Sequence, residues 1–418
     1  MTQMESKERN QFVDIMRGMA MLLVVLGHTM TGCTVDSQKS LLYNIVWSLQ
    51  MPLFILISGY VTKYSRSICD GKDLGKYVKR RTVAYMLPWA VWSFLIRGFL
   101  FGESNWLKVK WLLWHMDSGY WFLATIWTIS MIFGVACYLA ERIGKSSIIK
   151  KQVTLLLCYL TGMVFLAGIG TLMGLSFFAI KLTLYYMPFY YAGYLYGQID
   201  DKLVSINNGK KVIDCVVAVC LAIWLFVILR VSLYEMSDSG IAVILRAATS
   251  LAGCIAVCGL YSGIFSDKNR GGYGVDWRTF SGSIPRTLSV IESNQSGQQP
   301  CVLQSIGDDT CLDKLHNNRT WCGIVDRVDK QEQSIENGAY GKEKLINLFL
   351  WAGKHSLEIY MIHGLLLNIL KSSVPIRFSN FQGYLLTAGN LVLTIGLCAL
   401  VIELLDKNRI LKKFLSIR

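Results

Sequence analysis

The chain is divided by apolar stretches that are long enough to cross a lipid bilayer. A transmembrane helix needs about 17–25 predominantly apolar residues, because the hydrocarbon core of a bilayer is about 30 Å thick. Ten such stretches can be placed, at roughly 12–32, 41–61, 84–101, 119–140, 152–169, 181–198, 212–233, 241–264, 347–369 and 382–404. Composition agrees, since 53% of the 418 residues are hydrophobic and only 17% are charged. The sequence therefore predicts an all-α, polytopic bundle of about ten transmembrane helices.

The basic residues predict the side of the membrane on which each loop lies. Ten spans place both termini on one side, and loops rich in Lys and Arg face the cytoplasm. The loop after the second span carries seven basic and two acidic residues, whereas Lys39 is the one basic residue in the loop after the first. We therefore expect both termini to be cytoplasmic. The net charge of +14 is spread over such short loops, so it does not indicate a nucleic-acid partner.

One segment breaks the apolar pattern. Residues 265–344 hold ten basic and eleven acidic residues, together with Ser-rich and Gly-rich patches. This composition predicts a disordered cytoplasmic loop, with a small independent domain as the alternative. The expected organisation is a membrane core over 1–264, the polar loop over 265–344, and the last two spans with a basic tail over 345–418.

The first apolar stretch carries two ionisable side chains on one helical face. Ten residues separate Arg17 from His28 and none of them ionises, while eleven helical positions make about three turns over about 16 Å. Ionisable groups inside a bilayer cost roughly 2.5–3.5 kcal/mol on insertion scales, so His28 is a candidate functional residue. Imidazole can act as a base near neutral pH, whereas Arg17 can hold an anion or a carbonyl group. The alternatives are an interfacial anchor for Arg17 and a packing residue for His28.

Two further groups are candidates. At 1.5 Å per residue, His363 lies about 25 Å along the ninth span, and His28 lies about 15 Å beyond the cytoplasmic end of the first, where we place Arg17; this predicts that His363 is nearer the outer face. Its alternative role is also packing. Lys79, Arg80 and Arg81 form a basic cluster before the third span. They could bind the phosphates of a soluble donor, or attract anionic lipids and set the topology.

Three local patterns predict structural roles for their residues. Ser58 and Gly59, at the end of the second span, allow another helix to approach closely. Tyr120 and Trp121 indicate an aromatic belt at the membrane interface. The tyrosines between 185 and 196 indicate core packing, with stacking on a sugar ring as the alternative.

Taken together, the motifs resemble the family-three membrane acyltransferases, which include fucose 4-O-acetylase-like proteins. The resemblance rests on FVDIMRGMAMLLVVLGH at 12–28, PLFILISGY at 52–60, GYWFL at 119–123, YYMPFYYAGYLYG at 185–197 and GKHSLEIYMIHG at 353–364, in the order found in the family. In that family two arginines with two residues between them precede the proline of the third span. Here Lys79, Arg80 and Arg81 stand further upstream of Pro88.

The resemblance implies a multi-pass enzyme of the bacterial plasma membrane. Such an enzyme transfers an acyl group, usually acetyl from acetyl-coenzyme A, to a sugar hydroxyl of an extracytoplasmic polysaccharide or lipid-linked glycan. It implies catalytic roles for Arg17, His28 and His363, with His28 either a general base or an acyl carrier. Neither a permanently bound cofactor nor a metal is expected, and the sequence indicates no oligomeric state.

We place the acyl-CoA donor at the cytoplasmic end of the bundle, with its phosphates near Lys79, Arg80 and Arg81 and its thioester arm passing Arg17. The rival interpretation is a polytopic transporter or flippase for a lipid-linked sugar, which would use Arg17 and His28 for anion binding and proton coupling. The sequence shows no inverted repeat and no paired broken helices, which favours the enzyme.

Overall fold

The computed structural model describes residues 11–116, 119–144, 147–205, 209–266, 343–370 and 376–408. Nearly all of them are helical. The described residues up to Ser262 and from Leu348 onward form one compact unit. The predicted polar loop at 265–344 lies almost wholly outside the described residues.

Seven helices of the described part of the chain are long and apolar enough to cross a membrane. They are α1 (Gln11–Cys33), α2 (Leu41–Tyr60), α5 (Trp121–Ile143), α6 (Ile148–Met173), α8 (Gly209–Arg230), α9 (Gly240–Ser266) and α13 (Phe381–Lys407). An all-helical, multi-pass membrane protein is therefore confirmed. The total of ten spans and the cytoplasmic termini remain predictions.

The other three predicted stretches are helical but do not meet the same criteria of length and hydropathy. The third falls on α3 (Gly71–Ala90) and a π-helical continuation (Val91–Leu100), and the sixth falls on α7 (Ile180–Ser205). The ninth is divided between a helix at 343–354 and α12 (Ser356–Leu370). Short helices lie at Ser37–Lys39, Val61–Tyr64, Ser104–Leu107, Val109–Trp114 (α4) and Phe177–Ala179.

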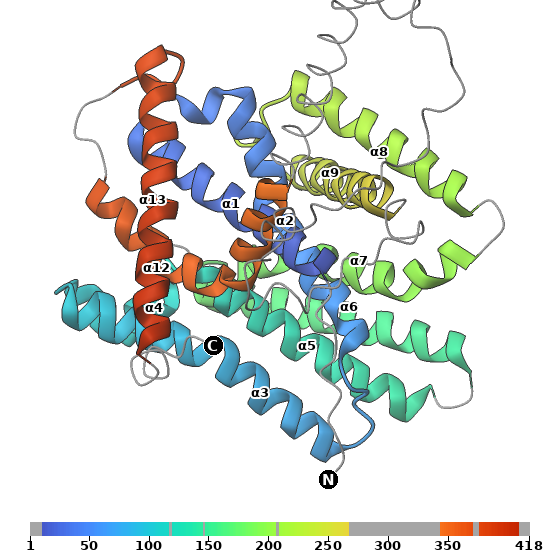
Figure 1. Cartoon of the computed structure of the whole chain (residues 1–418). Coiled ribbons are helices and arrows are strands. Elements are labelled where there is room, and N and C mark those ends of the chain that lie inside the picture. Colours follow the sequence, from blue (N-terminus) through green and yellow to red (C-terminus); the bar gives the residue numbers. More distant parts are fainter. Residues whose placement is uncertain are drawn as a thin grey trace, which may run out of the picture. The chain divides into compact units, whose positions relative to one another are not determined.

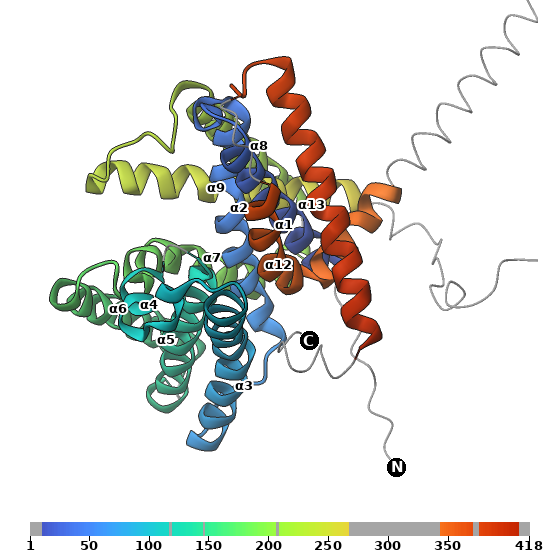
Figure 2. The same cartoon turned by 90° about the vertical axis from the view of Figure 1, so that its left-hand side faces the viewer.

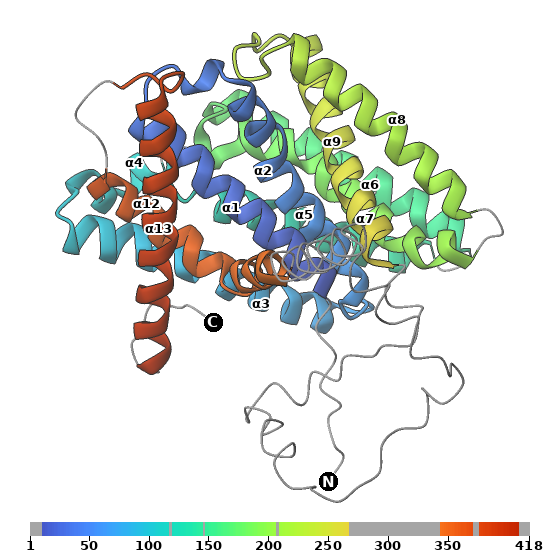
Figure 3. The same cartoon turned by 45° about the horizontal axis from the view of Figure 1, so that its top comes forward.

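Helices α1 and α2 pack on each other and on helices from later parts of the chain. Helix α1 packs on α2, α12 and α13, and α2 packs along α7 (Figure 1). Helix α5 lies beside both α3 and α6 (Figure 2). Helices α8 and α9 lie side by side (Figure 3), since a Cβ on Gly259 of α9 would lie 2.0 Å from Val217 of α8.

A pair of glycines brings α2 and α7 into backbone contact. A Cβ at Gly59 would lie 1.9 Å from the carbonyl oxygen of Tyr190, and a Cβ at Gly193 would lie 1.8 Å from that of Leu56. No side chain fits at either position, so the two backbones can touch. The prediction that Ser58 and Gly59 permit close approach is confirmed.

The structure confirms one prediction about the aromatic residues and contradicts another. Tyr186, Tyr190 and Tyr194 are buried in the main hydrophobic core, which confirms core packing for these three. Tyr120 is only 8% exposed, and the rings of Trp92 and Trp106 lie 6.5 and 5.9 Å from its own. The interfacial-belt prediction is therefore wrong for Tyr120, because the segment that precedes α5 folds over it.

Asn44 closes the end of α8. It is 4% exposed, and its Nδ2 donates to the carbonyl oxygens of Ile228 at 2.9 Å and Val231 at 2.7 Å. Its Oδ1 accepts from the backbone N–H of Leu233 at 2.9 Å. One buried amide of α2 thus satisfies three backbone groups at a helix end that has no intrahelical partners for them.

We expect Asn44→Ala to destabilise the protein by about 2–3 kcal/mol, because each buried backbone group left without a partner costs about 1 kcal/mol or more. Chemical unfolding in detergent micelles measures the change. The control is Asn105→Ala, which removes an exposed side chain whose Oδ1 accepts from Lys108 and should change stability by less than about 0.5 kcal/mol. Equal effects of the two substitutions would contradict this account of Asn44.

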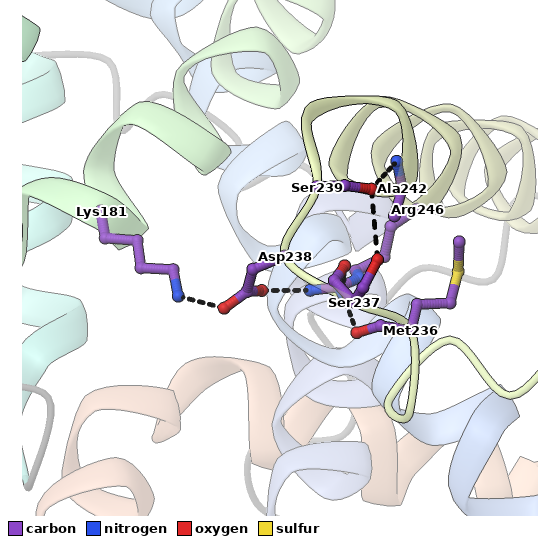
Figure 4. Close-up of polar contacts among 7 residues, drawn as sticks. All are labelled: Lys181, Met236, Ser237, Asp238, Ser239, Ala242 and Arg246. Carbon is purple, nitrogen blue, oxygen red and sulfur yellow. Dashed lines mark hydrogen bonds and ion pairs between the residues drawn. The ribbon is translucent and has the colours of Figure 1, made fainter.

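The loop between α8 and α9 is held by charged groups from two helices (Figure 4). Arg246 of α9 donates through Nη2 to the carbonyl oxygens of Met236 at 2.8 Å and Ser237 at 3.1 Å. Asp238 accepts from Nζ of Lys181, at the start of α7, at 2.7 Å. This hydrogen bond and the positive charge of Lys181 lower the pKa of Asp238. The ion pair is therefore complete above about pH 4, the usual range of an aspartate, and is lost only as pH falls through the lowered pKa.

Candidate functional site

Arg17 and His28 lie on one face of α1, as their spacing predicts. Arg17, Met21 and Val24 line a cavity in the bundle, and His28 follows one turn further along the same face. Asp14, one turn before Arg17, is buried. The face of α1 that carries Arg17 therefore lines the cavity, and His28 lies on the same face one turn beyond it.

Five helices form this central cavity, which has a volume of about 170 Å³. They are α1, α2, α3, α5 and α12. Most of its wall is apolar, and its polar side chains are Arg17, Ser58, Tyr85, Ser356 and Tyr360. Apolar walls with a few placed polar groups are typical of a site for a small molecule.

His28 and His363 meet beyond this cavity. Their ring centroids are 5.4 Å apart, with planes inclined by 44°. His363 is 4% exposed, whereas His28 is exposed between two buried neighbours. Nδ1 of His363 lies 2.8 Å from the carbonyl oxygen of Ile359. A carbonyl oxygen only accepts, so we assign the proton to Nδ1, which leaves Nε2 of the neutral ring as its accepting nitrogen.

The predicted difference in height between the two histidines is wrong. Counting along straight helices put them about 10 Å apart along the membrane normal, yet the rings are in contact. The reason lies in the starting points of the count, which began at Arg17 for His28 but at residue 347 for His363. Counted from the first residues of their predicted spans, 12 and 347, both histidines lie equally far along the helix. The backbone hydrogen bonds continue across the turn at His355, from His355 N–H to the Trp351 carbonyl and from Ile359 N–H to the His355 carbonyl.

The basic cluster is split by its helix. Lys79 and Arg80 are exposed, whereas Arg81 is half-buried. Nη1 of Arg81 donates to the Tyr85 hydroxyl at 3.0 Å, and its guanidinium lies 5.3 Å from the centroid of the Tyr77 ring. Because Tyr85 lines the central cavity, Arg81 alone of the three is linked to the cavity containing Arg17.

A second, basic cavity of about 270 Å³ was not predicted. Lys63, Arg66 and Lys151 line it together with Glu141, which forms an ion pair with Lys151. Tyr77, on which Arg81 stacks, also lines it. In the sequence, the basic residues of the loop that contains Lys63 and Arg66 indicated only the side of the membrane. Loop charge was the available signal, and it does not show that the segment after α2 encloses one space together with α3, α5, α6 and α7.

Within the ranges that the structure describes, no group of three or more His, Cys, Asp or Glu side chains is placed to hold a metal ion. The polar groups that the structure gathers are instead suited to an anion, a carbonyl oxygen and a proton transfer.

Comparison with protein families gives one match. A family model described as an acyltransferase domain, that of acyltransferase family 3, matches residues 10–290. The matched range contains Arg17, His28 and the basic cluster, while His363 lies beyond it. Neither a curated protein nor a solved structure matches the chain.

Proposed function

Because the chain belongs to acyltransferase family 3, we propose that it moves an acetyl or other acyl group from a cytoplasmic acyl-CoA to a sugar hydroxyl. The acceptor in this proposal is an extracytoplasmic polysaccharide or a lipid-linked glycan. The observation that carries the proposal is the arrangement along α1: a cavity that begins at Arg17 and ends beside the contact between His28 and His363. We place the enzyme in the plasma membrane of a bacterium.

In this proposal the donor enters from the end of the bundle that carries the basic loops. Its phosphates bind among Lys79, Arg80 and Arg81, and charge-assisted hydrogen bonds to phosphate favour this end of α3. The basic cavity beside Tyr77 adds positive charge to the same region. The thioester arm then extends past Arg17 into the central cavity, whose apolar wall suits its alkyl portions.

His28 acts as the general base. Its exposed side chain can be reached by an acceptor hydroxyl, whereas His363 is buried behind it. Imidazole is the side chain whose ordinary titration range suits this task, and Arg17 cannot replace it because a guanidinium does not deprotonate in proteins. His363 contacts the His28 ring and is positioned to hold its orientation.

The experiment follows the acyl group. Membranes that contain the protein are incubated with radiolabelled acetyl-coenzyme A and with surface polysaccharide from cells that lack the gene. We expect the label to enter the polysaccharide as an alkali-labile ester. Membranes without the protein provide the background. Movement of a lipid-linked sugar across the membrane with no transfer of label would overturn the proposal in favour of a transporter.

A further inference from the structure

Tyr360 lines the central cavity and lies beside the histidine pair. Tyr360 is on α12, one turn before His363, and their ring centroids are 6.0 Å apart. Its Oη accepts the backbone N–H of Phe122 at 3.3 Å. Phe122 is the second residue of α5, where a helix N–H has no partner within its own helix.

This contact determines what the hydroxyl can still do. A phenol oxygen that accepts from an N–H keeps its own proton for another acceptor. Among the residues that the structure describes, none accepts a hydrogen bond from Tyr360 Oη, and Tyr360 lines the central cavity. The amide at the positive end of α5 also polarises the phenol and makes it a better donor. The wall of the cavity therefore presents one oriented O–H near the two imidazoles.

We propose that Tyr360 donates this hydrogen bond to the carbonyl oxygen of the acyl group during transfer, an inference that rests on the function proposed above. The acceptor oxygen attacks the thioester carbon, a C–O bond forms, and the hydroxyl proton passes to His28. The carbonyl oxygen then carries the negative charge, which Tyr360 stabilises while keeping its own proton. Collapse of this intermediate breaks the C–S bond, and the coenzyme A thiolate takes the proton from His28.

Tyr85 provides a contrast within the same cavity. Its hydroxyl also accepts, from Arg81 at 3.0 Å, so its proton is likewise available to a bound molecule. It belongs to α3, on the side of the basic cluster, and has no ring contact with either histidine among the described residues. Tyr85 therefore holds the donor arm, where ground-state and transition-state binding are equal, whereas Tyr360 acts where charge develops.

The test compares the kinetic constants of two substitutions that remove one hydroxyl each. We expect Tyr360→Phe to lower kcat by about 10²–10³-fold, as for the loss of one oxyanion donor, with KM for acetyl-coenzyme A within about twofold of wild type. We expect Tyr85→Phe mainly to raise KM. If Tyr360→Phe keeps its kcat, or changes KM alone, the assignment of Tyr360 is overturned.

The control is Tyr120→Phe. Tyr120 belongs to the same aromatic cluster, 6.2 Å from the Tyr360 ring, but its hydroxyl donates to the Met361 carbonyl oxygen at 3.4 Å and does not line the cavity. We expect its kcat to remain within about twofold of wild type, the range of an uninvolved hydroxyl. An equal loss of kcat in Tyr120→Phe and Tyr360→Phe would indicate a packing effect and overturn the assignment.

A second measurement does not depend on whether Tyr360→Phe folds. Placing 3,5-difluorotyrosine at 360 makes the hydroxyl a stronger donor, and the assay is run at a pH at which it stays protonated. We expect kcat to rise at 360 and not at 120, and equal responses would overturn the inference. Failure of the inference about Tyr360 can be distinguished from failure of the proposed function. In the latter case the wild-type protein itself transfers no acyl group from any acyl-CoA.

Discussion

His28→Ala is expected to reduce acyl transfer by about 10²–10⁴-fold, the usual contribution of a positioned general base. The imidazole lies one helical turn beyond Val24, which lines the central cavity, and contacts His363, and Arg17 cannot take over proton removal. The loss should appear in kcat, measured as the rate at which label from acetyl-coenzyme A enters polysaccharide. Because the His28 side chain is exposed, its removal leaves no buried cavity, and the amount of protein in the membrane should not change.

The matched control for this substitution is His115→Ala. His115 is also exposed, and its ring stacks on Trp111 with centroids 4.9 Å apart, outside the central cavity. Its removal should leave the transfer rate unchanged. Near-normal transfer by His28→Ala would contradict the assigned role, as would an equal loss in both variants.

Local periodicity explains what the sequence could predict of this site. The shared face of Arg17 and His28 depends only on the turn of one helix, so their spacing was enough. The same rule explains the split of the basic cluster, since neighbouring residues on a helix point about 100° apart and cannot face one cavity. Which of the three turns inward depends on Tyr77 and Tyr85, each one turn from Arg81.

Tertiary contacts explain what the sequence could not predict. The contact of His363 with His28 joins α12 to α1, two helices from opposite ends of the chain. The contact between the Phe122 amide and Tyr360 joins residues 238 positions apart. The basic cavity is likewise lined by the segment after α2 and by helices that are distant along the chain. No pattern within a single span encodes these distances.

The crossing of α1 with the helix at 343–354 leads to the prediction with the largest expected effect on folding. A Cβ at Gly353 would lie 1.8 Å from the carbonyl oxygen of Asp14, and one at Gly18 would lie 1.9 Å from that of Phe349. Both obstacles are backbone atoms, so a rotamer change cannot relieve the clash and the helices must separate. We expect Gly353→Ala to destabilise the protein by at least about 2–3 kcal/mol, measured by chemical unfolding in detergent.

Separation of these helices should also reduce activity, because the crossing positions both halves of the site. Gly18 adjoins Arg17, and Gly353 lies two residues before the turn at His355 that leads into α12 with Tyr360 and His363. The control is Gly389→Ala in α13, where nothing lies within 4 Å of the added Cβ. Alanine favours a helix over glycine by about 1 kcal/mol, so that variant should be as stable as wild type or more so. If Gly353→Ala behaves like Gly389→Ala in both unfolding and acyl transfer, then backbone contact at this crossing does not hold the site together.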